Sequence, residues 1–297
     1  MGCDLCPRRC GTNREAGERG VCGMGAGIRV ARAAPHMWEE PPISGSRGSG
    51  TVFFSGCPLR CVFCQNRVLS AEGYGVEVSE ERLEEIILRL ASQGVHNINL
   101  VTPTHFSDKL VPVLERLRPQ LNIPIVYNCG GYESVETLRR LDGLVDIYLP
   151  DFKYASRELA AKYSAAPDYP QVAAAALREM HRQRGGAVFD DDGIMKSGVI
   201  VRHLVLPGCR RDSARVLRLI ADTVPVEDIK LSIMRQYTPE FVDAAAYPEL
   251  ARRLTSFEYD FVVAEAARLG FDGFTQQKES ATAEYTPNFD LTGIFNS

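Results

Sequence analysis

Long apolar segments are missing from this sequence. No stretch approaches the ~18 consecutive apolar residues that indicate a membrane-spanning helix, and the N-terminal residues lack the apolar core of a secretory signal. An excess of positive charge is missing as well, because 34 Lys and Arg residues stand against 38 Asp and Glu residues, a net charge of −4. We therefore expect a cytoplasmic protein whose main partner is neither a membrane nor a nucleic acid.

Cysteine, in contrast, is abundant, with nine residues in 297. Most of them lie in two groups with short, metal-site spacings, while Cys209 has no obvious partner. Without a secretory signal, this clustering indicates metal ligation in a reducing compartment rather than disulfide bonding.

The second group is the more informative one. Cys57, Cys61 and Cys64 are spaced C-x3-C-x2-C and follow the apolar run 51–55, which predicts a short buried strand. Three soft thiolates suit three corners of a 4Fe–4S cluster and leave the fourth iron open to a small molecule. A structural zinc site, which would need a fourth ligand, and a set of buried thiols are the alternative interpretations.

Three regions follow from composition. Residues 1–50 are rich in Cys, Gly, Pro and Arg and predict an irregular metal-binding segment and linker, residues 51–275 alternate short apolar runs with helical patterns, and residues 276–297 form a tail. The predicted strands are 51–56, 97–102, 124–129, 144–149, 199–206 and 229–234. The predicted helices are 79–92, 107–118, 133–141, 168–184, 213–222 and 248–269.

This strict alternation of strands and helices predicts an α/β fold with a parallel sheet. The sheet is either open and doubly wound or a partial barrel, since six β–α units are too few for a closed eight-unit barrel. In both architectures ligands bind at the carboxyl ends of the strands. Polar residues do follow the predicted strands, although loops are polar in general: Thr102–His105, Asn128–Gly131, Asp151–Lys153, Arg202 and His203, and Arg235–Tyr237.

The cysteine triplet and the pattern that follows it resemble the radical S-adenosylmethionine (SAM) superfamily over residues 50–275. The closest branch is that of the pyruvate formate-lyase activating enzymes, in particular members with a cysteine-rich N-terminus. The resemblance implies a partial (βα)6 barrel and a 4Fe–4S cluster whose open iron binds the amino and carboxylate groups of SAM. It also implies reductive cleavage of SAM to a 5′-deoxyadenosyl radical.

The same resemblance implies the SAM contacts. Phe63 matches the aromatic residue near the adenine, Asp151 and Lys153 match a D-x-K element, and Arg202 matches an inward-facing arginine. Further positions are Asn128, which follows the third strand beside Cys129, and Tyr237, whose alternative role is core packing. In the family a Gly-Gly-Glu motif holds the SAM amino group. Here the sequence departs from that motif, and Thr102, Thr104 and His105 occupy the place.

The first cysteine group is Cys3, Cys6, Cys10 and Cys22, spaced C-x2-C-x3-C-x11-C. Four thiolates match a structural zinc ion or a second, closed Fe–S cluster. Its role is either structural or that of an electron relay, and the spacing does not decide between the two metals.

We expect an oxidoreductase that abstracts hydrogen from a glycine of a partner glycyl-radical enzyme, supplied with electrons by a flavodoxin- or ferredoxin-type donor. Radical modification of another peptide or of a small molecule is the first alternative. A non-catalytic metal-binding scaffold is the second.

Overall fold

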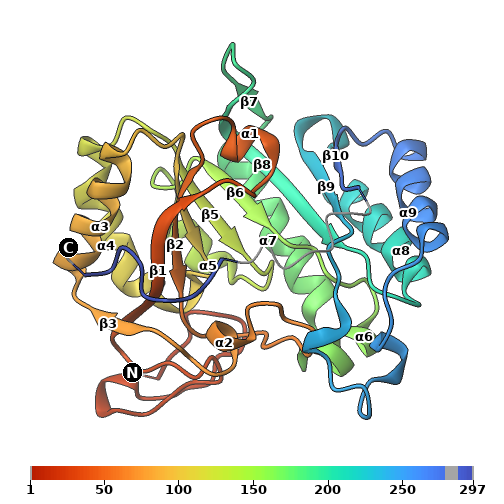
Figure 1. Cartoon of the computed structure of the whole chain (residues 1–297), viewed down its shortest axis with the longest axis horizontal. Coiled ribbons are helices and arrows are strands. Elements are labelled where there is room, and N and C mark those ends of the chain that lie inside the picture. The colour runs from red at the N-terminus through yellow and green to blue at the C-terminus, as the bar shows by residue number, and fades with distance from the viewer. Residues whose placement is uncertain (1, 278–286, 296–297) are drawn as a thin grey trace.

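The computed structural model describes residues 2–277 and 287–295, and within them one sheet of ten strands organises the chain (Figure 1). The strands are β1 (Ile28–His36), β2 (Ser49–Phe54), β3 (Val76–Val78), β4 (Ile98–Val101), β5 (Ile125–Cys129), β6 (Ile147–Pro150), β7 (Val188–Phe189), β8 (Met195–Leu204), β9 (Lys230–Met234) and β10 (Gly273–Thr275). Their order is β10-β9-β8-β6-β5-β4-β2-β1-β3, with β7 paired to β8.

Parallel pairing joins β2, β4, β5, β6, β8, β9 and β10 in that order, whereas β1 is antiparallel to both β2 and β3. In the described part of the chain, the pairing path ends at β3 on one side and at β10 on the other. The fold is therefore an α/β fold with a mostly parallel sheet that curves into a partial barrel (Figure 1).

The helices are α1 (Pro41–Ser44), α2 (Arg67–Ser70), α3 (Glu80–Ser92), α4 (Ser107–Leu117), α5 (Val135–Arg140), α6 (Arg157–Ser164), α7 (Tyr169–Arg184), α8 (Arg210–Ala221) and α9 (Ser256–Arg268). The longer ones cover the outer face of the sheet (Figure 1). Short 3-10 helices lie at Arg14–Ala16, Thr104–Phe106, Arg118–Gln120, Val226–Asp228, Pro239–Phe241 and Pro248–Leu250. Within the described ranges, no helix combines the length and apolar character needed to cross a bilayer.

Capping residues fix where several helices begin. Ser79, Ser134 and Ser156 each accept a hydrogen bond from a backbone N–H in the first turn of α3, α5 and α6. Thr255 and Glu258 form a reciprocal capping box at α9. The last helix therefore begins at Ser256, and the predicted start at 248 is wrong because Pro248 opens only a 3-10 turn.

Two apolar layers hold the barrel. The larger lies between sheet and helices, and the smaller fills the barrel interior with Val126, Ile147, Leu149, Met195 and Ile200, against which Ile43 of α1 packs. Every β4 residue is buried, as expected of a strand covered on both faces. α1 thereby closes one end of the barrel and leaves the polar cavity described below on its inner side.

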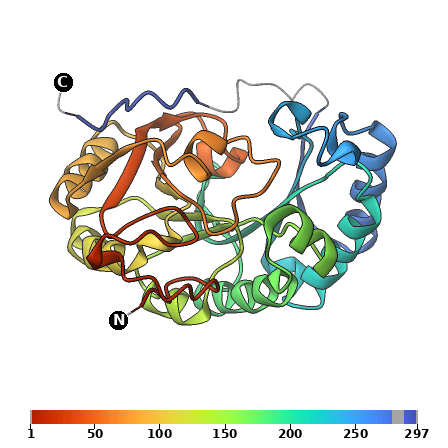
Figure 2. The ribbon, with the colours of Figure 1, turned by 90° about the horizontal axis from the view of Figure 1, so that it is seen from below.

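The N-terminal region differs from the sequence prediction. Residues 28–36 form the nine-residue strand β1, so the expectation of an irregular segment over all of 1–50 is wrong. The strand has no regular alternation of buried and exposed residues, because its register shifts between Val30 and Arg32. Residues 2–27 contain only a short 3-10 helix and run along the barrel rim (Figure 2).

The C-terminal stretch lies along β1 (Figure 2). The backbone N–H of Leu291 donates to Ala31 at 3.1 Å, and that of Ala33 donates to Thr292 at 2.9 Å. Ile294 is buried. The tail predicted at 276–297 therefore packs on the protein where it is described, while residues 278–286 and 296–297 lie outside the described residues.

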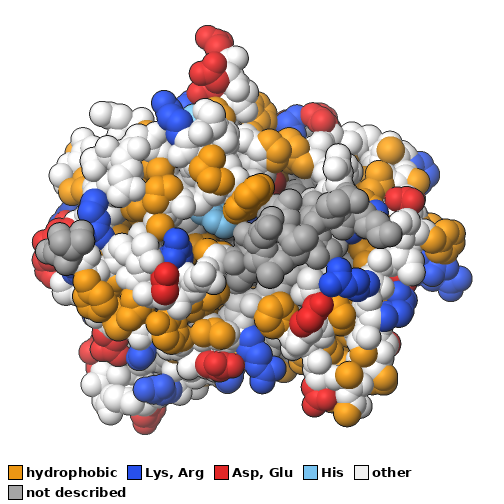
Figure 3. Space-filling model, viewed as in Figure 1, with side chains coloured by type: hydrophobic (Ala, Val, Ile, Leu, Met, Phe, Trp, Pro, Cys, Tyr) orange, Lys and Arg blue, Asp and Glu red, His pale blue; other side chains and the backbone are white. Residues whose placement is uncertain are grey.

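Figure 3 shows the surface in the orientation of Figure 1. Acidic side chains gather at the projecting tip between β7 and β8, where Asp190 pairs with Lys196 at 2.8 Å. Elsewhere on this face, side chains of both charges are interspersed.

Candidate active site

The cysteine loop, residues 57–64, leaves the carboxyl end of β2 at a sharp turn. Gly56 has a φ of +82°, and a Cβ at this position would lie 2.8 Å from the carbonyl oxygen of Cys22. Only glycine combines this backbone conformation with so close an approach. The backbone N–H of Cys57 donates to the same carbonyl at 3.3 Å, so the turn is fixed against the N-terminal segment.

Each sulfur of the loop receives a hydrogen bond. Ser164 Oγ donates to Cys61 Sγ at 3.0 Å, Ser70 Oγ donates to Cys64 Sγ at 3.3 Å, and the Leu59 N–H donates to Cys57 Sγ at 3.4 Å. Such donors stabilise negative charge on a thiolate. Hydrogen bonds of this kind also tune the properties of metal clusters held by thiolates.

The thiols of Cys57 and Cys64 are protonated when no metal is bound. Burial raises the pKa of Cys57 to about 12 and raises the pKa of Cys64 above its usual value, and the adjacent Cys61 adds to both shifts. Because the thiolate is the ligating form, metal binding releases these protons.

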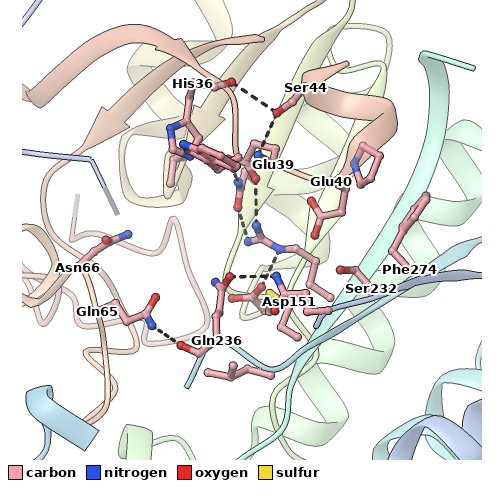
Figure 4. Close-up of a pocket in the computed structure, with 18 of the residues that line it drawn as sticks. His36, Glu39, Glu40, Ser44, Gln65, Asn66, Asp151, Ser232, Gln236 and Phe274 are labelled. Atoms are coloured by element: carbon pink, nitrogen blue, oxygen red, sulfur yellow. Dashed lines mark hydrogen bonds and ion pairs between the residues drawn. The ribbon is translucent and has the colours of Figure 1, made fainter. Parts of the chain in front are cut away.

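A cavity of about 930 Å³ lies inside the barrel beside the cysteine loop. This volume lies within the range of ligand pockets. Figure 4 shows Gln65 and Asn66 at one end of it, Glu40, Ser232 and Phe274 at the other, and Asp151 between them. Cys61, Phe63 and Cys64 line the cavity together with Asn128, Asp151, Lys153 and Arg202. The structure thus brings seven of the predicted site residues to one space.

Charged groups form a paired network on the cavity wall. Arg202 donates to Asp151 at 3.0 Å and to the amide oxygen of Asn128 at 2.6 Å, and Lys153 donates to Asp151 at 2.5 Å. Burial alone would raise the pKa of Asp151, but Arg202 and Lys153 hold it below its usual value. Asp151 in turn raises the pKa of both bases against the effect of burial. All three groups are therefore ionised at neutral pH.

Glu39 completes this network, and the sequence prediction missed it. It accepts hydrogen bonds from Asn99 at 2.9 Å, from Asn128 at 3.3 Å and from Arg202 at 3.4 Å. The residue lies between β1 and α1, within the segment predicted to be a linker. The signal that could have revealed it is the Pro pair after two acids, which is typical of a helix start.

The Thr102–His105 turn lies outside the cavity lining. Thr102 has a φ of +58°, which is rare for a β-branched residue, and its N–H donates to the Asn128 carbonyl at 2.8 Å. Thr104 and His105 are buried. Burial lowers the pKa of His105 to about 4, and its Nε2 bonds to the carbonyl of Ser55 at 2.7 Å. A neutral imidazole with Nε2 protonated satisfies that contact.

Tyr237 is also buried outside the cavity lining. Its hydroxyl donates to the Leu250 carbonyl at 2.6 Å, and its ring meets that of Phe63 with centroids 6.4 Å apart. Tyr237 thus packs against Phe63, which lines the cavity. Contact of Tyr237 and of the Thr102–His105 turn with SAM stays a prediction.

The N-terminal cysteines Cys3, Cys6, Cys10 and Cys22 were predicted to form a second metal site. Thr12 Oγ1 donates to Cys10 Sγ at 3.2 Å, and Arg14 donates to Cys22 Sγ at 3.5 Å. Burial raises the pKa of Cys6 to about 12, whereas hydrogen bonds from Thr12 outweigh burial and lower that of Cys10 to about 7. Across residues 2–277 and 287–295, no three His, Cys, Asp or Glu side chains converge tightly enough to hold a single metal ion. This finding applies to Cys57, Cys61 and Cys64 as well as to the N-terminal group, so the metal predicted at each group stays a prediction.

Residues 51–190 match the family model of the Radical SAM superfamily. An uncharacterized protein of Methanocaldococcus jannaschii is 29% identical in an alignment of 282 positions that covers 91% of this chain and 75% of that protein.

Solved structures share the fold. Streptococcus suis SuiB is 10% identical, with a TM-score of 0.50, over 80% of this chain and 52% of SuiB. SuiB bound to its precursor peptide SuiA is likewise 10% identical with a TM-score of 0.50, over 74% of this chain and 46% of that one. This chain thus spans about half the length of SuiB, and the likeness shows the fold alone.

Proposed function

We propose, from the radical SAM superfamily domain at residues 51–190, that the protein is an enzyme that cleaves SAM reductively with a 4Fe–4S cluster held by Cys57, Cys61 and Cys64. One observation carries the proposal. Cys61 and Cys64 open onto a cavity whose wall carries the ionised Lys153 and Arg202. Three thiols and an open side are the donor set that such a cluster needs.

A cluster held by Cys57, Cys61 and Cys64 would supply one electron for cleavage of the C5′–S bond of SAM, which would give methionine and a 5′-deoxyadenosyl radical that takes a hydrogen atom from the substrate. The chain's own residues bind and orient the reactants. Lys153 and Arg202 provide the positive charge for the SAM carboxylate. Phe63 offers an aromatic edge for the adenine, and Asn128 offers amide hydrogen-bonding groups. The turn of Thr102, Thr104 and His105 follows Val101, which lines the cavity, and we propose that it supports the amino-group side of SAM without lining the cavity itself.

The substrate we propose is a backbone glycine of a partner glycyl-radical enzyme, with another peptide or a small molecule as the alternative. The partial barrel supports access for a peptide loop, because in the described residues its pairing path stays open between β3 and β10. A flavodoxin- or ferredoxin-type protein would supply the electron. Cys3, Cys6, Cys10 and Cys22 would hold a second metal centre, zinc or Fe–S.

The test is SAM turnover by anaerobically reconstituted protein, with dithionite as the reductant. We expect wild type to release 5′-deoxyadenosine and Cys64→Ala to release none. Cys209→Ala is the matched control, because Cys209 lies at the start of α8 away from the cavity lining, and it should behave like wild type. Equal product from wild type and Cys64→Ala, or none from wild type, would refute the proposal.

A further inference from the structure

Glu40 lies at the end of the cavity opposite Gln65 and Asn66 (Figure 4). It is the N-cap residue of α1 and is followed by Pro41, whose fixed φ starts the helix. Its fractional exposure is 9%, so more than nine-tenths of the residue is buried. The side chain nevertheless lines the cavity, and Figure 4 shows its carboxylate pointing inward.

The other carboxylates that line the cavity have partners. Asp151 has Arg202 and Lys153, and Glu39 has Asn99, Asn128 and Arg202. Glu40 differs, because its Oε2 atom is buried and has no hydrogen-bond partner among the described residues. A buried carboxylate oxygen left without a donor costs free energy, and native proteins rarely keep one without a reason.

The surroundings of Glu40 suit one class of group. Ser232 of β9 and Phe274 of β10 line the same corner, so a carboxylate, a hydroxyl and an aromatic ring face one space (Figure 4). Carboxylates and aromatic rings both attract alkylammonium and guanidinium groups. Burial is the largest influence on Glu40 and raises its pKa together with the neighbouring Glu39, against the lowering effects of Arg202 and of a hydrogen bond from Ser232. A cation bound beside the carboxyl group would favour its ionised form.

We infer that the corner formed by Glu40, Ser232 and Phe274 binds an alkylammonium or guanidinium group of the substrate. This inference rests on the proposed function, in which SAM occupies the end of the cavity beside the cysteine loop. It defines the substrate class as a molecule with a positively charged nitrogen group at some distance from the hydrogen that is abstracted. A Lys or Arg side chain of a peptide and a free amine both carry this chemistry.

Binding of matched probes to the reconstituted full-length protein tests the inference, read by ligand-observed NMR in phosphate buffer with SAM present. The probes are butylammonium, butylguanidinium, 1-butanol and butyrate. We expect the two cations to bind about tenfold more tightly than the alcohol, and butyrate not to bind. Glu40→Gln should abolish the preference for cations. The exposed Glu115→Gln, which removes the same charge elsewhere, should preserve it.

Phe274→Leu provides a second variant that leaves the buried carboxylate in place. It should weaken binding of the cations and leave that of 1-butanol unchanged. A lysine-bearing tripeptide compared with its norleucine analogue distinguishes the two sources, since a peptide substrate predicts that the lysine peptide binds more tightly than butylammonium and a free-amine substrate predicts the reverse.

Equal binding of butylammonium and 1-butanol to wild type would overturn the inference, as would cation binding that persists in Glu40→Gln. Butylammonium that binds only when SAM is left out would assign the corner to the SAM amino group and also overturn the inference. Failure of the proposed function looks different: wild type would then release no 5′-deoxyadenosine, whatever its preference among the probes.

Discussion

Arg202 and Asp151 are joined twice. The Arg202 guanidinium donates to the Asp151 carboxylate at 3.0 Å, and the two residues form a parallel bridge that extends the pairing of β6 and β8. The sheet itself therefore positions Arg202, the residue that pairs with the acidic groups of the cavity wall. Both side chains are largely buried, which makes the pair costly to break.

Replacement of Arg202 by Met should destabilise the protein by about 3–5 kcal/mol, because it leaves Asp151 and Glu39 as poorly compensated buried charges. Denaturant unfolding measures this change. Arg218→Met is the control, since Arg218 pairs with Glu265 on the surface and its loss should cost below about 1 kcal/mol. Equal losses in the two variants would contradict the account of the network.

Arg8 links the N-terminal segment to the cysteine loop. It donates to the carbonyls of Pro58 at 2.8 Å and Ser164 at 2.7 Å, and also to that of Ala165. Arg8→Ala should cost about 1.5–3 kcal/mol and raise hydrogen exchange in residues 57–64, as read by mass spectrometry. The adjacent Arg9 is exposed, so Arg9→Ala should leave exchange in the loop unchanged. Unchanged exchange in Arg8→Ala would show that the contact does not hold the loop.

Thr102 tests whether the turn after β4 stores strain. Its φ of +58° suits glycine, so Thr102→Gly should preserve the free energy of unfolding or raise it by up to about 1 kcal/mol. Thermal or denaturant unfolding measures this, and a loss above about 1 kcal/mol would contradict the strain. The KM for SAM should rise in the same variant, as the proposed role of the turn on the amino-group side of SAM predicts.

His105 should make stability depend on pH. Burial lowers its pKa to about 4 in the folded state, against about 6.5 in the unfolded chain. The unfolded state therefore binds the proton first, and stability is lost as pH falls from about 6.5 to 4, by up to about 3 kcal/mol. His105→Gln should flatten this part of the profile of unfolding free energy against pH. His36, whose pKa burial also lowers to about 4, would retain a share of the slope. A profile identical to wild type would refute the assignment.

The parallel strands and the residues at their ends were predictable because both depend on local pattern. Apolar runs such as 98–101 and 125–127 predict buried strands, and the structure has strands there. The cavity position of Asp151, Lys153 and Arg202 could be predicted because the ends of parallel strands meet at one edge of the sheet. The predicted strand bounds differ from the observed ones where pairing with a distant segment decides them. β8 begins at Met195 and not at 199, because β7 pairs with its first residues.

The acidic end of the cavity was not predictable in the same way. Glu39 and Glu40 reach it because β1 adds antiparallel to β2 and carries the chain back to the barrel end that α1 closes. That path depends on long-range pairing within a segment of loop-like composition. Conversely, Thr102, Thr104 and His105 follow a strand as expected, but the left-handed turn at Thr102 places them outside the cavity lining.

The central claim is that Cys57, Cys61 and Cys64 hold a 4Fe–4S cluster with one iron open to SAM. Electron paramagnetic resonance of the anaerobically reconstituted, dithionite-reduced protein tests it most directly, in a chain whose Cys3, Cys6, Cys10 and Cys22 are replaced by Ala. The account predicts about four irons per chain and a reduced-cluster signal that changes when SAM is added, both lost in Cys57→Ala. A signal that SAM leaves unchanged, or iron retained in full by Cys57→Ala, would contradict it.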